Sequence, residues 1–150
     1  MYPLRENWKA KGMTMCEIPP IRMLVLTLTG RCNFKCLYCY ASEQDPVDMT
    51  EETAIAAVAL AHVSKNQFLL QFSGGEPLLQ FPLIRKVVDF VEKNHVNAQM
   101  QIQTNGALLT KDIGKWLFDH NVGIGISCDG RPELMNRLRV SKDGDRSSQK

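Results

Sequence analysis

Three closely spaced cysteines carry the most specific chemistry in this chain. Cys32, Cys36 and Cys39 form a Cys-x3-Cys-x2-Cys run directly after an apolar segment at residues 22–29. Thiolates select iron–sulfur clusters, zinc or copper(I) over hard cations. Because an electron-transfer iron–sulfur cluster normally takes four thiolates, a cluster held by three would leave one iron open to another ligand. The spacing therefore predicts a metal centre with an open coordination position.

A zinc site and a disulfide framework are the alternative interpretations of these cysteines. Structural zinc takes a fourth ligand, usually from a second Cys or His pair at a regular spacing. The other candidate ligands occur only singly along the chain, at Cys16, His62, His95, His120 and Cys128. Disulfides fit less well, because the five cysteines are an odd number and no secretory signal is recognised. We therefore expect reduced cysteines and a cytoplasmic protein.

Composition narrows the class of protein further. The 150 residues are 44% hydrophobic, which is enough for the core of one ordinary domain. No apolar run approaches the ~18 residues that a membrane span requires. The net charge of +2 comes from 18 basic and 16 acidic residues without a basic run. Neither a nucleic acid nor a membrane surface is therefore expected as a partner.

Strand-like and helical patterns alternate along the chain. Strands are predicted at residues 23–29, 68–72, 98–104 and 122–128, and helices at 50–66, 82–94 and 111–121. This alternation predicts an α/β fold with a parallel sheet, wound by right-handed crossovers into a layer or an open barrel. Residues 1–21 are expected to form an N-terminal extension before a domain at 22–150. In the last helix, Trp116 and Phe118 are expected to serve helix packing.

Polar loops containing glycine follow the three later strands. Their sequences are Ser73-Gly-Gly-Glu-Pro77, Gln103-Thr-Asn-Gly106 and Ser127-Cys-Asp-Gly130. Barrel enzymes place their chemistry on the loops that follow the carboxyl ends of strands. Paired glycines also allow a backbone to approach a ligand closely. Each loop taken alone is a common turn sequence, so the order of the four loops matters more than any one of them.

The segment Gly30-Arg-Cys-Asn-Phe-Lys-Cys-Leu-Tyr-Cys-Tyr40 resembles the cluster loop of the radical S-adenosylmethionine (radical SAM) enzymes, including Tyr38 before the third cysteine. The resemblance implies a [4Fe-4S] cluster on Cys32, Cys36 and Cys39. Its open iron would chelate SAM, pass one electron to the sulfonium and release a 5′-deoxyadenosyl radical that takes hydrogen from a substrate. The family fold is a partial (β/α) barrel of six strands, of which about four βα units would be present here. The chain is therefore expected to be truncated on its C-terminal side.

The same resemblance implies contacts to SAM at the later strand ends. Main-chain carbonyls of Gly74 and Gly75 would receive the ammonium group of SAM, and Glu76 would help. An ammonium group has three donors and no acceptor, so backbone oxygens and a carboxylate satisfy it. Asn105, which precedes Gly106 in a common turn pair, gives only weak support for a further contact.

The region from Ser127 onward is similar to the fourth-strand region of sulfatase-maturating and peptide-modifying (SPASM-type) radical SAM enzymes. The similarity implies that Ser127 and Arg139 reach the ribose and the carboxylate of SAM. Arginine suits a carboxylate because its planar fork donates two parallel hydrogen bonds and keeps its charge. Arg137 is the competing arginine, but the spacing from Ser127 favours Arg139.

The implied function is that of a radical SAM enzyme acting on a peptide or protein side chain. A reducing partner such as a flavodoxin or ferredoxin would supply the electron. No catalytic acid or base is assigned in the chain, because that group and the auxiliary-cluster cysteines are expected beyond residue 150. Two alternatives stay open: a non-catalytic fragment that binds an iron–sulfur cluster or zinc, and a radical SAM activase or cofactor-biosynthesis enzyme.

Overall fold

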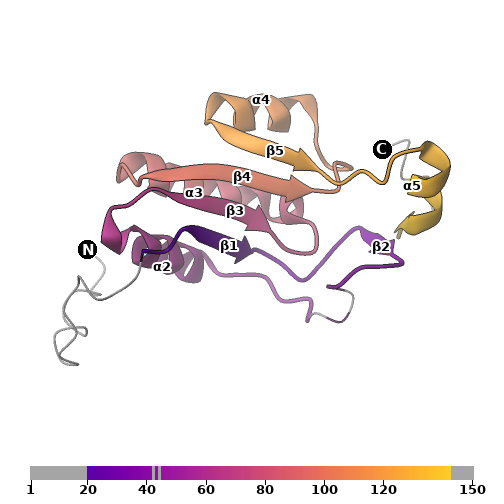
Figure 1. Cartoon of the computed structure of the whole chain (residues 1–150), viewed down its shortest axis with the longest axis horizontal. Helices are drawn as coiled ribbons and strands as arrows, with labels where there is room; N and C mark the ends of the chain where they lie inside the picture. The colour runs from indigo at the N-terminus through magenta and orange to yellow at the C-terminus, as the bar shows by residue number, and fades with distance from the viewer. Residues whose placement is uncertain (1–19, 42, 44, 143–150) are drawn as a thin grey trace.

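The computed structural model describes residues 20–41, 43 and 45–142. Its centre is a parallel sheet with the strand order β1-β3-β4-β5, so each strand lies beside the next one along the chain (Figure 1). The strands are β1 (Met23–Thr27), β3 (Phe68–Ser73), β4 (Ala98–Thr104) and β5 (Val122–Ile126). The predicted α/β fold with a parallel sheet is confirmed.

Three helices connect these strands, as the sequence predicted. They are α2 (Glu51–Ala61), α3 (Phe81–Lys93) and α4 (Lys111–Asp119), and short 3₁₀ helices follow α2 and precede α3 at η3 (His62–Ser64) and η4 (Pro77–Gln80). The hydroxyl of Thr50 caps α2 by accepting a hydrogen bond from the Thr53 N–H at 3.2 Å. The prediction that this helix continues to residue 66 is wrong. Its end tightens into η3, and Lys65 then adopts the left-handed conformation at φ 57°.

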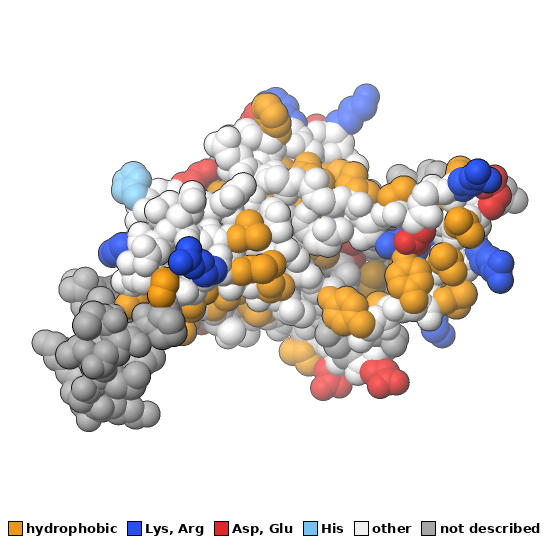
Figure 2. Space-filling view, viewed as in Figure 1, with side chains coloured by type: hydrophobic (Ala, Val, Ile, Leu, Met, Phe, Trp, Pro, Cys, Tyr) orange, Lys and Arg blue, Asp and Glu red, His pale blue; other side chains and the backbone are white. Residues whose placement is uncertain are grey.

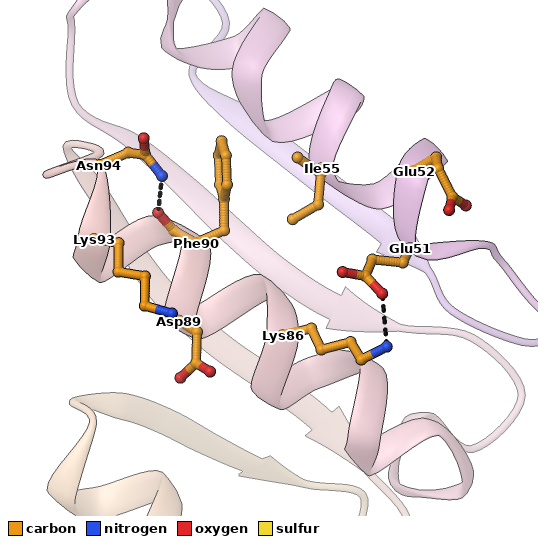
Figure 3. A pocket seen from close by; sticks show the side chains of 8 residues that line it. All are labelled: Glu51, Glu52, Ile55, Lys86, Asp89, Phe90, Lys93 and Asn94. Atoms are coloured by element: carbon orange, nitrogen blue, oxygen red, sulfur yellow. Dashed lines mark hydrogen bonds and ion pairs between the residues drawn. The ribbon is translucent and has the colours of Figure 1, made fainter. Parts of the chain in front are cut away.

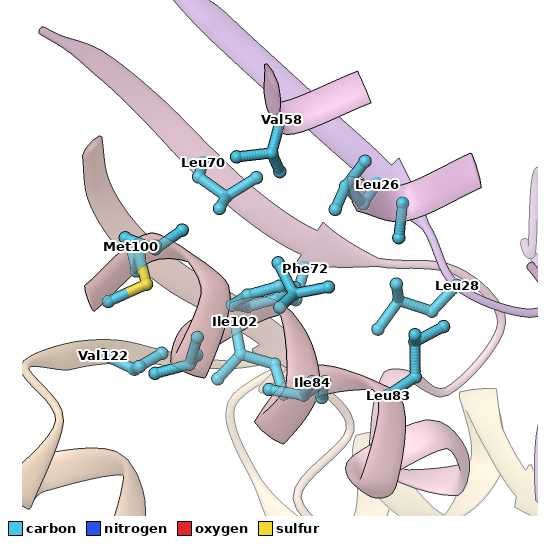
Figure 4. Close-up of a cluster of buried hydrophobic side chains, with 14 of the residues drawn as sticks. Leu26, Leu28, Val58, Leu70, Phe72, Leu83, Ile84, Met100, Ile102 and Val122 are labelled. Carbon is cyan, nitrogen blue, oxygen red and sulfur yellow. The ribbon is translucent and has the colours of Figure 1, made fainter. Parts of the chain in front are cut away.

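The hydrophobic core lies between the sheet and the helices behind it in Figure 1. Alternate strand side chains point to the helices, including Leu26, Phe72 and Ile102, whose exposed fractions are 1%, 0% and 1% (Figure 4). From α3, Ile84 and Val88 pack into the same cluster. The apolar spacing of this helix therefore places one face on the sheet, as its pattern indicated.

No helix of the described residues covers the opposite face of the sheet, which faces the viewer in Figures 1 and 2. Amide side chains and exposed Val25 contribute to this face, and the Gln101 amide donates to the Gln71 side-chain oxygen at 2.7 Å. Charged side chains lie mostly toward its margins (Figure 2). The uncovered face thus combines amide and apolar side chains, including exposed Met23, and carries little charge over the strands (Figure 2).

A second sheet and a short helix were not predicted from the sequence. Strands β2 (Phe34–Cys36) and β6 (Arg139–Ser141) form an antiparallel pair, and α5 (Pro132–Leu138) leads into β6. Each strand has three residues, too few to show a period of two. About one hundred positions separate them in the sequence. Only the folded chain therefore reveals this pairing.

The sequence prediction for Phe118 is wrong. Leu117 occupies the buried position of α4 and Trp116 packs beside the core, but the Phe118 side chain is 80% exposed. A residue one step along a helix is rotated by about 100°, so Phe118 turns away from the stripe that contacts the sheet.

In the part of the chain that the structure describes, no helix is both long and apolar enough to cross a membrane.

The buried ring of Phe72 provides a test of this core. We expect Phe72→Ala to lower the free energy of unfolding by about 3–5 kcal/mol, because a fully buried ring leaves a cavity. The same change at exposed Phe118 should alter it by only about 0.5 kcal/mol. Urea unfolding followed by circular dichroism measures both values. Equal losses in the two variants would contradict this assignment of the core.

Candidate functional site

The four loops singled out in the sequence meet at one end of the sheet. Because the strands are parallel, their carboxyl ends point the same way, toward β2 and α5 in Figure 1. Hydrogen bonds join neighbouring loops, including Gly75 N–H to the Thr29 carbonyl at 2.7 Å and Ser127 N–H to the Thr104 carbonyl at 2.9 Å. The chain thus places its cysteine loop beside the glycine loop and the ends of β4 and β5.

The three cysteines of the run are partly buried, and none forms a disulfide. Burial raises the pKa of the Cys32 and Cys36 thiols. The charges of Glu76 and the Cys39 sulfur add to the rise at Cys32, and the sulfurs of Cys32 and Cys39 add to the rise at Cys36. The three thiols are therefore near enough to influence one another. Within the described ranges, no three His, Cys, Asp or Glu side chains gather closely enough to hold one metal ion.

The pairing of β2 with β6 holds the cysteine loop in place. Cys36 lies opposite Arg139 in this pair, and the Leu37 N–H donates to the Leu138 carbonyl at 2.9 Å. The positive charge of Arg139 acts to lower the pKa of the Cys36 thiol, against the larger effect of burial. The structure thus brings the predicted arginine to the predicted cysteine loop.

Asp129 joins Tyr38 and Arg139 into one unit. The Tyr38 hydroxyl donates to Asp129 Oδ2 at 2.6 Å, and Arg139 Nε donates to the same oxygen at 2.7 Å. These two hydrogen bonds lower the pKa of Asp129, and the bond from Tyr38 has the larger effect. Desolvation, and after it the hydrogen bond to Asp129, raise the pKa of Tyr38 to about 12. Only 12% of the Arg139 side chain is exposed. Asp129 therefore orients Arg139 through one of the five guanidinium N–H groups and leaves others for a ligand.

Asp129 had no signal of its own in the sequence, because Asp-Gly is a common turn pair. Its partner Tyr38 lies 91 residues away in the chain. The competing arginine, Arg137, sits exposed on α5, where its position does not bring it into the Asp129 unit. Of the two arginines, Arg139 therefore belongs to the Asp129 unit.

The two glycines after β3 let that loop press against the cysteine loop. A Cβ on Gly74, whose φ is +146°, would lie 2.5 Å from the Thr29 carbonyl oxygen, and one on Gly75 would lie 2.2 Å from the Arg31 carbonyl oxygen. Either contact would force backbone to move. Among the described residues, the Gly74 and Gly75 carbonyls accept no main-chain hydrogen bond from a neighbouring loop. Their oxygens therefore remain able to accept from a ligand.

Glu76 is fully buried and its carboxylate is engaged by the protein. Oε1 accepts from the Leu78 N–H at 3.0 Å and from the Thr104 hydroxyl at 2.7 Å, while Oε2 accepts from the Asn105 N–H at 2.9 Å. The side chain thus holds the loop after β3 to the loop after β4. Its geometry makes it a positioning residue, whereas the adjacent glycines offer main-chain oxygens.

Ser127, at the end of β5, is held by a glutamine that sequence reasoning missed. Gln103 Nε2 donates to Ser127 Oγ at 3.1 Å, so the serine oxygen accepts and its hydrogen can be donated elsewhere. A Cβ at Gly125 would lie 2.5 Å from Gln103 Oε1. The missing side chain at Gly125 therefore gives Gln103 room to cross from β4 to β5.

A shallow pocket between α2 and α3 lies outside this site (Figure 3). Side chains of both charges line it together with two apolar residues, and Lys86 is paired with Glu51 at 2.6 Å. All its lining residues come from these two helices except Asn94, which directly follows α3. None of the predicted site residues contributes to it.

Known proteins resemble this chain over most of its length. It is 40% identical over 126 residues to an uncharacterized protein of Methanocaldococcus jannaschii, covering 83% of this chain and 44% of that protein. It is 29% identical over 134 residues to a cysteine-type anaerobic sulfatase-maturating enzyme of Clostridium perfringens, covering 81% of this chain and 36% of the enzyme. The chain therefore spans less than half the length of these relatives.

The fold has a solved counterpart, native anSMEcpe with bound AdoMet and the Cp18Cys peptide. The TM-score is 0.77 at 26% sequence identity, over 87% of this chain and 37% of that one. The family model of the radical SAM superfamily matches residues 26–147, which include the cysteine run and Arg139. The sequence, the arrangement of the loops and these matches lead to one conclusion: the chain belongs to the radical SAM superfamily.

Proposed function

We propose that this chain binds a [4Fe-4S] cluster and SAM in the cytoplasm, as part of an enzyme that starts radical chemistry. The observation that carries the proposal is the placement of three mutually interacting thiols beside the oriented guanidinium of Arg139. When bound, the cluster would supply the electron that splits SAM into methionine and a 5′-deoxyadenosyl radical, and this radical would take a hydrogen atom from the substrate. The protein supplies binding and orientation.

Each predicted residue has a role that its position supports. Cys32, Cys36 and Cys39 would hold three irons as thiolates and leave the fourth open. Arg139 would bind the SAM carboxylate, since Asp129 already fixes its direction and little of its side chain is exposed to water.

The loops after β3 and β5 would contact other parts of SAM. The Gly74 and Gly75 carbonyls would accept from the SAM ammonium group, and Glu76 would help by fixing the loop that carries them. Ser127 would donate its hydroxyl hydrogen to the ribose or carboxylate, because Gln103 already occupies its acceptor side. Main-chain and side-chain groups on neighbouring strands would therefore bind different parts of SAM.

We further propose a peptide or protein side chain as the substrate of the complete enzyme. The support is similarity to a sulfatase-maturating enzyme and to a solved structure that holds AdoMet together with a peptide. A flavodoxin or ferredoxin would deliver the electron. Because the chain spans under half of these relatives, this substrate is proposed for the whole protein.

Anaerobic reconstitution tests the cofactor proposal directly. We expect about four iron and four sulfide per chain, a spectral change on adding SAM, and 5′-deoxyadenosine after reduction with dithionite. A colourless protein that takes up a single zinc ion would contradict the proposal and favour a zinc-binding fragment. The same measurement therefore separates the two kinds of metal centre.

Cysteine substitutions provide a matched pair for the cluster. Cys36→Ala should abolish cluster assembly, because two remaining thiolates cannot hold a four-iron cube stably. Cys128→Ala should leave assembly unchanged, since Cys128 is exposed and lies outside the run. Iron analysis and the visible absorption of both reconstituted variants measure the difference. Normal iron content in the Cys36 variant would show that the run is not the ligand set.

Arginine substitutions test the carboxylate contact. Arg139→Ala should weaken SAM binding by ~1.5–3 kcal/mol, the range for hydrogen bonds to charged groups. Arg137→Ala, which removes an exposed arginine from α5, should leave the affinity close to that of the parent chain. Titration of the reconstituted proteins with SAM provides the dissociation constants. If only the Arg137 variant lost affinity, the carboxylate contact would move to that residue.

A further inference from the structure

The side-chain amide of Asn105 lies beside the sulfur of Cys32. Its Nδ2 is 3.8 Å from Cys32 Sγ and donates to the Asn33 side-chain oxygen at 2.8 Å. An amide nitrogen carries two N–H groups, so it serves both partners at once. Asn105 therefore stands next to a proposed cluster ligand from a different strand.

The orientation of this amide follows from its hydrogen bonds. The Asn105 side-chain oxygen accepts from the Ala107 N–H at 3.0 Å, within the same turn. Rotating the amide by 180° would place its N–H groups against the Ala107 N–H and its oxygen against the Asn33 oxygen. Both contacts would lose a hydrogen bond, so the NH₂ group faces Cys32.

Buried contacts also fix the backbone that carries this amide. Glu76, which has no exposed surface, accepts from the Asn105 N–H at 2.9 Å. The Gly106 N–H donates to the Thr104 hydroxyl oxygen at 3.0 Å, and that hydroxyl in turn donates to Glu76. The turn is thus tied at three successive residues. The amide donor is preorganised at the sulfur without the need for a ligand to place it.

Cys32 is distinguished from the other two cysteines by these donors. The Phe34 N–H also points to Cys32 Sγ, at 3.3 Å, so this sulfur has two N–H donors. Among the described residues, no N–H donor is recorded at the sulfur of Cys36 or Cys39. Hydrogen bonds to cluster sulfurs stabilise the added negative charge of the reduced state and so raise the reduction potential.

We propose that Asn105 is a positioning residue that sets the reduction potential of the cluster by donating a hydrogen bond to the Cys32 thiolate. This inference rests on the proposed [4Fe-4S] function and adds a residue to it. In the reduction concerned, one electron passes from an external low-potential reductant to the cluster. Asn105 would make this step more favourable, while the Phe34 N–H supplies the second donor to the same sulfur.

Two substitutions at Asn105 test the proposal. Asn105→Ala removes the donor, and Asn105→Asp keeps an oxygen for the Ala107 N–H but replaces the donor with a carboxylate. The control is Asn97→Ala, an exposed asparagine before β4 at the other end of the sheet. The readout is the midpoint potential of the reconstituted chain without SAM, from a reductive titration followed by electron paramagnetic resonance.

We expect both Asn105 variants to bind iron normally and to have more negative midpoint potentials than the parent chain. A tenfold loss in the equilibrium constant for reduction corresponds to a shift of ~59 mV in the midpoint potential for one electron. The aspartate variant should show the larger shift in midpoint potential. The Asn97 variant should match the parent.

Three other outcomes would overturn the proposal. Potentials equal to that of the parent in both Asn105 variants would reject it and leave the cluster assignment intact. Loss of the cluster in both, with a normal Asn97 variant, would show that Asn105 maintains the loop and does not tune the cluster. A parent chain that assembles no cluster would reject this inference together with the proposed function.

Discussion

A buried carboxylate holds the loops of the site in place. Glu76 has no exposed surface, and its oxygens accept three hydrogen bonds from Leu78, Thr104 and Asn105. A charge removed from water is tolerated only when such donors replace the lost hydration. This requirement works in both directions, because the carboxylate needs the donors and the donors fix the ends of β3 and β4. Displacing the loop after β4 would leave Glu76 with only the Leu78 N–H as a partner.

Periodic features of the chain were readable from the sequence, and contacts between distant segments were not. The burial of Phe72 and Val88 follows from alternating strand residues and from helical spacing, so the sheet and its helices were predicted. Asp129 and the pairing of Cys36 with Arg139 involve three-residue strands and a turn, which carry no periodic signal. Motif order predicted which loops meet, but the hydrogen bonds within them depend on the fold.

The glycines of the site show how the same sequence feature can have a different physical cause from the one expected. Paired glycines predicted close approach of the backbone to a ligand. In the structure, the backbone that approaches Gly74 and Gly75 most closely belongs to the cysteine loop, at Thr29 and Arg31. Side chains at either glycine would push the two loops apart. Close packing of the loops thus comes first, and any access of a ligand to the main-chain oxygens depends on it.

Arg139 and Asn105 act on different cysteines of the run, and they differ in how a ligand would affect them. The positive charge of Arg139 lies by Cys36, whereas the neutral amide of Asn105 lies by Cys32. Both favour negative charge on sulfur. Asp129 already pairs with Arg139, and a SAM carboxylate bound as proposed would offset the charge of Arg139 at Cys36 further. The Asn105 amide has no net charge that a SAM carboxylate could offset, so its effect on the cluster should persist whether or not SAM is bound.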